Sequence, residues 1–186
     1  MKNTTILLLL LITFTIAGCS SCKKNVDTSS DNPYGLPNAT QEGKNTLGFL
    51  LNGQPWTPKG QVGLSANLTV NVDLGYNQGV FVIGAYRYTS STGIQEPFTI
   101  GIRDSLKFFQ FPITVPLSKT SLYGITYRNV QCDYFNQQGN VQCNGNLTIT
   151  KLDKSSQILS GTFNATFYKP GCDTIKITEG RFDMKY

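Results

Sequence analysis

The stretch LSANLTVNVDL at residues 64–74 decides the fold class of this chain. All of its even positions carry apolar side chains, and all of its odd positions carry polar ones. Successive side chains of a β-strand point to opposite faces of a sheet. The alternation therefore predicts a strand with one buried and one solvated face.

The same period of two residues recurs in the chain beyond Lys44. It is found at residues 98–102, 113–117, 147–149 and 159–167. Residues 80–89 are apolar on both faces in their first half, which predicts a more central strand. Short turns such as Asn52-Gly53 separate these runs, and no stretch has the period of a long amphipathic helix. We predict an all-β fold, an antiparallel up-and-down meander of about ten strands that closes into a barrel or a sandwich.

Two of the expected strands change the parity of their apolar positions partway along. Residues 175–177 place apolar side chains at odd positions, whereas residues 182–184 place them at even positions. One extra residue must be absorbed between these two segments, so we predict a β-bulge at Glu179-Gly180. A similar change of parity predicts a second bulge near Arg128-Asn129.

Residues 1–18 have the features of a lipoprotein signal peptide. Lys2 precedes an apolar run at residues 6–16, which is followed by Ala17-Gly18-Cys19. This run is much shorter than the roughly 20 residues of a spanning helix, so we predict a cleaved signal. The small residues before Cys19 match a lipobox, which makes the Cys19 thiol the expected lipidation site. Acyl chains such as palmitate would anchor the mature protein to a membrane. An ordinary signal peptide followed by a chance cysteine is the alternative.

The composition predicts two regions after the signal peptide. Residues 19–44 are rich in Ser, Asn, Asp, Thr, Pro and Gly, and we expect a flexible tether there. Residues 45–186 are expected to form one all-β domain. The residues after Cys19 lack an acidic cluster, which favours the periplasmic leaflet of the outer membrane, with the cell surface as the alternative.

The five cysteines divide into three groups. Cys19 is assigned to lipid and Cys22 to the tether. The other three lie at one end of the expected meander, and we predict one disulfide among them in an oxidising compartment. Cys132 with Cys172 is the favoured pair, and Cys143 is the alternative partner of either. Three thiols without a fourth ligand do not predict a metal site.

The composition also excludes most catalytic chemistry. The chain contains no histidine, which removes imidazole bases, His-activated nucleophiles and His-ligated metals. Glycoside hydrolysis needs only two carboxylates. However, only Glu96, Glu179 and Asp183 lie within expected strands, and their spacing brings no two of them together. We therefore predict a protein that is not an enzyme and has no cofactor. The net charge of +5 is scattered, which does not predict a nucleic-acid partner.

Both ends of the expected domain carry recognisable motifs. They are LPNATQEGKNTLG at residues 36–48, LNGQPW at 51–56, GNLTITKLD at 145–153, ILSGTF at 158–163 and ITEGRFD at 177–183. These motifs resemble a family of uncharacterised Bacteroidota cell-envelope lipoproteins, a domain of unknown function that ends in a Gly-Arg-Phe-Asp strand. The resemblance implies a lipid-anchored, single, all-β domain, and it implies no catalytic residues.

Two functional hypotheses follow, and a third is retained for comparison. The first is a structural or protein-interaction component of an envelope assembly, in which the strand aromatics are core. The second is a binding module for a small apolar ligand or a glycan, and its walls would be Phe81, Tyr86, Phe98, Tyr123, Tyr127, Phe163 and Phe167. The third is a carboxylate-based glycoside hydrolase. Trp56 is expected to plug the core or to stack on a sugar. Arg181 and Asp183 are expected to pair with each other or with a neighbouring strand.

Overall fold

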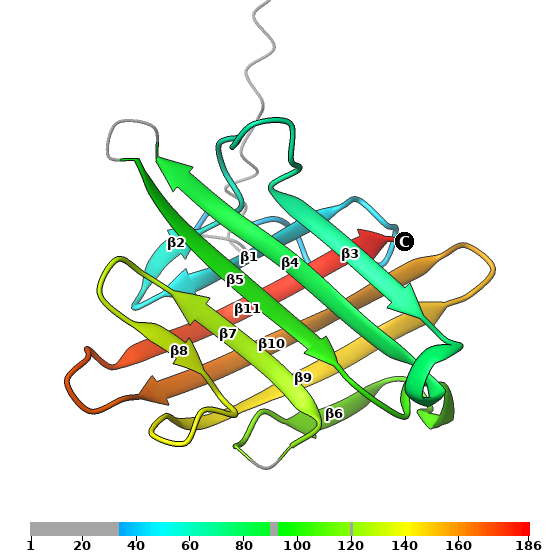
Figure 1. The fold of residues 1–186 in the computed structure, drawn as a ribbon. Coiled ribbons are helices and arrows are strands. Elements are labelled where there is room, and N and C mark those ends of the chain that lie inside the picture. Colours follow the sequence, from blue (N-terminus) through cyan, green and yellow to red (C-terminus); the bar gives the residue numbers. More distant parts are fainter. Residues whose placement is uncertain (1–33, 90–92, 120) are drawn as a thin grey trace, which may run out of the picture.

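The computed structural model describes residues 34–89, 93–119 and 121–186. These residues form two antiparallel β-sheets that face each other as a sandwich (Figure 1). Sheet A has the strand order β2 (Gln54–Trp56), β1 (Thr46–Leu51), β11 (Ile175–Lys185), β10 (Ile158–Tyr168), β9 (Gln142–Asp153) and β6 (Ile113–Pro116). Sheet B has the order β3 (Leu68–Asp73), β4 (Val80–Thr89), β5 (Ile94–Ile102), β7 (Tyr123–Arg128) and β8 (Asp133–Phe135). The predicted all-β class is confirmed in its sandwich form.

The strand order departs from a simple meander at one strand. Consecutive strands pair in β3-β4-β5 and in β9-β10-β11, as an up-and-down arrangement requires. Strand β6, however, pairs with β9 in sheet A, whereas its chain neighbours β5 and β7 pair with each other in sheet B. Strand β1 pairs with β11, the last strand of the chain. Turn residues predict where strands end but not which sheet the next strand joins.

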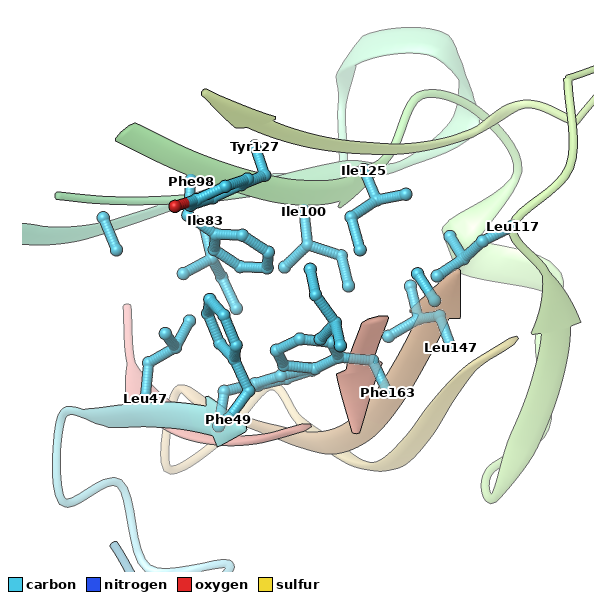
Figure 2. Close-up of a cluster of buried hydrophobic side chains, with 14 of the residues drawn as sticks. Leu47, Phe49, Ile83, Phe98, Ile100, Leu117, Ile125, Tyr127, Leu147 and Phe163 are labelled. Atoms are coloured by element: carbon cyan, nitrogen blue, oxygen red, sulfur yellow. The ribbon is translucent and has the colours of Figure 1, made fainter. Parts of the chain in front are cut away.

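Aromatic and branched side chains fill the space between the two sheets (Figure 2). Phe49 of sheet A lies 4.8 Å from Phe98 of sheet B between ring centroids, and Phe163 lies 5.4 Å from Phe98. Five of the seven aromatics that could have lined a ligand cavity are buried in this core: Phe81, Phe98, Tyr127, Phe163 and Phe167. Rings at these separations pack on one another, so the interior supports the core interpretation of the strand aromatics.

One of the two predicted bulges is confirmed. Phe163 pairs with Gly180 and Ala165 pairs with Ile177, so β11 holds an extra residue at this point. Glu179 absorbs it with a positive φ of 53°. The second prediction is wrong because the chain reverses at residues 129–132 and β8 pairs back onto β7. The Asn129 side chain accepts hydrogen bonds from the backbone N–H groups of Gln131 and Cys132, and the turn that they form also changes the parity of the apolar positions.

The strand expected at residues 64–74 begins later than its alternation suggests. Leu64 is fully exposed, and β3 starts at Leu68. The apolar side chains of Leu68, Val70 and Val72 are half-buried, because β3 forms the edge of sheet B. Strand β4 lies between β3 and β5 as predicted, although its Val82 side chain faces outward and is exposed.

The expected tether is ordered against the sandwich in its last part. Leu36 is buried, and a Cβ added at Gly48 of β1 would lie 2.7 Å from Cδ of Pro37. We call residues 36–44 the strap, because the segment packs onto the outer face of sheet A. The boundary predicted at residue 45 is therefore too late, since the folded unit includes Leu36.

Candidate functional site

Asp183 of β11 holds the strap in place. Its carboxylate accepts hydrogen bonds from Thr40 Oγ1 at 2.5 Å and from Ser160 Oγ at 2.7 Å. It also accepts hydrogen bonds from the backbone N–H groups of residues 42–44 at 2.8–3.2 Å. The side chain is completely buried. Because all of these groups donate to the carboxylate, Asp183 stabilises one conformation of the strap.

The pKa of Asp183 reflects this environment. Burial raises the pKa of the carboxyl, because it disfavours the charged form. The hydrogen bonds from Thr40, Ser160 and the strap backbone outweigh burial, and together they lower the pKa from 3.8 to about 2. The group is therefore ionised throughout the physiological range.

Glu96 of β5 has an equally specific structural role. Its carboxylate accepts a hydrogen bond from Trp56 Nε1 at 3.0 Å and binds Arg87 at 2.7 Å. Trp56 is fully buried and stacks on Phe49 with ring centroids 4.6 Å apart. The prediction that Trp56 plugs the core is thus confirmed. Glu96 supplies the hydrogen-bond acceptor that the buried indole N–H needs.

Glu179 completes the set of candidate carboxylates. Its side chain is exposed and lies 3.1 Å from the Arg181 guanidinium. The expected pairing of Arg181 with Asp183 is wrong, because the bulge turns Arg181 back toward Glu179 while Asp183 binds the strap. Glu96 lies in sheet B and the other two acids lie in β11 of sheet A. The structure gives each of the three a different set of partners.

The cysteine prediction is confirmed for the favoured pair. Cys132 and Cys172 form a disulfide between residues separated by 40 positions. Cys143 is free and half-buried. Burial raises the pKa of the Cys143 thiol to about 12. The lipidation site Cys19 and the tether cysteine Cys22 lie outside the described residues.

A polar groove crosses the outer face of sheet A. It has a volume of about 640 Å³. It is lined by Ala39 of the strap, Asn146 and Thr148 of β9, Thr162, Phe163 and Asn164 of β10, and Thr178, Glu179, Gly180 and Arg181 of β11. We did not predict this groove from the sequence. The sequence shows the solvated positions of β9 and β10 that line the groove. Only the register between the two strands shows that these positions lie side by side.

Three exposed apolar side chains occupy loops that are joined at one end of the sandwich. Tyr76 of η1 (Tyr76–Gln78) is 61% exposed, Phe108 of η2 (Leu106–Phe108) is 68% exposed, and Leu122 is 53% exposed. We call these three residues the apolar end surface. The Ser105 N–H donates to the Asn77 carbonyl at 3.0 Å, and the Arg103 N–H donates to the Leu122 carbonyl at 3.2 Å. These backbone hydrogen bonds hold the three loops beside one another.

Within the described part of the chain, no helix is long and apolar enough to cross a membrane. Nor do these residues contain a group of three or more potential metal ligands. No protein-family model, curated protein or solved structure matches the chain. The resemblance to Bacteroidota lipoproteins therefore stays a prediction from sequence.

Proposed function

We propose that this chain is a lipid-anchored protein of the bacterial cell envelope whose β-sandwich is a non-catalytic structural or protein-interaction component. The anchor is inferred from residues 1–19, where an apolar run ends in Ala17-Gly18-Cys19. We place the protein in the outer membrane, on the periplasmic face in preference to the cell surface. The structural roles of Glu96 and Asp183 support a domain without catalysis, because their carboxylates are already bound.

The apolar end surface is the observation that carries the interaction role. Exposed apolar residues are common when scattered singly, whereas several on loops that adjoin one another favour a site of association. Two of the three side chains are aromatic, and Tyr and Phe are enriched at protein interfaces. Two cations, Arg103 and Lys107, and two acids, Asp73 and Asp104, lie on or next to the same loops. The partner that fits is an envelope protein with an apolar patch.

The anchor is tested by the intact mass of the mature protein isolated from membranes. A chain that begins at Cys19 and carries acyl chains supports the proposal. The Cys19→Ser variant should retain the signal peptide and incorporate no fatty acid. A wild-type chain that is cleaved elsewhere, or that carries no acyl group, would contradict the anchor.

The interaction role is tested by crosslinking intact cells and purifying the full chain. The Tyr76→Ser/Phe108→Ser variant should lose a partner that the wild type captures. Tyr168→Ser is the matched control, since Tyr168 is an exposed aromatic residue on sheet A. A partner retained by the double variant, or lost equally in the control, would refute the role of the apolar end surface.

A further inference from the structure

The polar groove on sheet A has the dimensions of a ligand site. Its volume of about 640 Å³ falls within the range of about 300–1,000 Å³ that is typical of small-molecule pockets. Strands β9, β10 and β11 form its floor, and Ala39 of the strap lies at one side. Asp183 fixes the strap, so the groove has a defined wall in the absence of any ligand.

The strand register aligns neutral polar side chains in the groove. Thr148 pairs with Thr162 across β9 and β10, and Asn146 pairs with Asn164 one step further along. Neighbouring strands lie about 4.8 Å apart, so each row presents closely spaced hydrogen-bonding groups. Among the described residues, the side chains of Asn146, Thr162 and Asn164 have no hydrogen-bond partner. Each amide or hydroxyl can both donate and accept, and all three are exposed.

The charges of the groove select among ligand classes. Among the described residues that line the groove, Arg181 is the one cation, and its guanidinium is paired with Glu179 at 3.1 Å. A phosphate-rich ligand would need several unpaired cations. The core of a protein interface is rich in aromatic and apolar side chains, whereas the exposed groove residues are polar apart from Ala39. An apolar ligand would leave the Asn and Thr groups without partners, which is costly.

We propose that the polar groove on sheet A binds a neutral saccharide. Sugar hydroxyls donate and accept hydrogen bonds as the Asn and Thr side chains do, and they carry no charge. The site differs from an interior cavity, because its exposed polar residues point away from the core. It is also separate from the apolar end surface, so either proposal can fail without the other.

The test measures binding of the full-length chain in detergent micelles to an array of neutral glycans and to heparin. The informative variant is Asn146→Val/Thr162→Val, which removes two polar groups that have no partner among the described residues and keeps β-branched side chains in the strands. The matched control is Thr99→Val/Thr126→Val, because these two threonines are paired across neighbouring strands of sheet B and line a separate hollow of about 370 Å³. Titration of each protein with the best-binding neutral glycan gives the dissociation constants.

We expect at least one neutral glycan to bind. The groove variant should weaken that binding about tenfold, as expected for two lost hydrogen bonds. The sheet B control should change it less than about twofold, which is within measurement error at a surface that the ligand does not touch. The proposal is overturned if no neutral glycan binds, if only heparin binds, or if the groove variant and the control have equal affinity.

Discussion

Replacing Asp183 with asparagine removes the charge that holds the strap on sheet A. The native pKa is about 2 against an ordinary value of 3.8, and one pKa unit corresponds to about 1.36 kcal/mol, so the charge contributes on the order of 2 kcal/mol. The asparagine NH₂ group also meets backbone N–H groups of residues 42–44, and a buried donor without an acceptor costs about 1–3 kcal/mol. We expect Asp183→Asn to lower the free energy of unfolding by about 4 kcal/mol at pH 7.

Urea denaturation monitored by the fluorescence of Trp56, the single tryptophan, measures this difference. The native pKa is depressed, so the charge contribution is complete above about pH 5 and is lost as the pH falls toward 2. The difference in free energy of unfolding between wild type and variant should therefore shrink by about 2 kcal/mol over that interval. Glu42→Gln is the control, because it removes an exposed strap charge and keeps the backbone N–H. A stability difference equal to that of the control, or one that is constant down to pH 2, would show that the Asp183 charge does not hold the strap.

Three further predictions concern the core and the cysteines. Cys132→Ser should lower the free energy of unfolding by about 2–4 kcal/mol in urea titrations of the oxidised protein, because it opens a 40-residue loop; no loss would argue against the disulfide. Trp56→Ala should cost about 3–5 kcal/mol by thermal unfolding, and Trp56→Phe should cost less, because phenylalanine keeps most of the buried ring. Cys143 should resist iodoacetamide at pH 8 in the native protein and react after denaturation, because its pKa of about 12 keeps the thiol protonated; rapid native labelling, detected by mass spectrometry, would contradict its burial.

Local patterns predicted the parts of the fold that depend on near neighbours in sequence. The alternation of β9, β10 and β11 predicted their buried faces, and the change of parity predicted the bulge at Glu179. The same signal failed at residues 128–134, because a four-residue turn changes parity just as a bulge does. It also failed at Leu64, which is fully exposed and lies before the start of β3 at Leu68.

The strap and the polar groove could not be predicted because both depend on long-range register. The partners of Asp183 in the strap lie about 140 positions earlier in the chain. Composition alone indicated a flexible tether there, since Ser, Thr, Asn and Gly predominate in both tethers and loops. Likewise, Asn146 and Asn164 are ordinary solvated strand residues until pairing of β9 with β10 places them side by side.

A photo-reactive amino acid at position 108 tests the interaction role most directly. The photo-reactive residue is placed in the full-length chain in living cells. A separate control variant carries it at position 168 on sheet A instead. We expect a discrete protein adduct from position 108, abolished by Leu122→Ser, and no such adduct from position 168. An adduct from position 168 alone, or no adduct from either position, would contradict a partner at the apolar end surface.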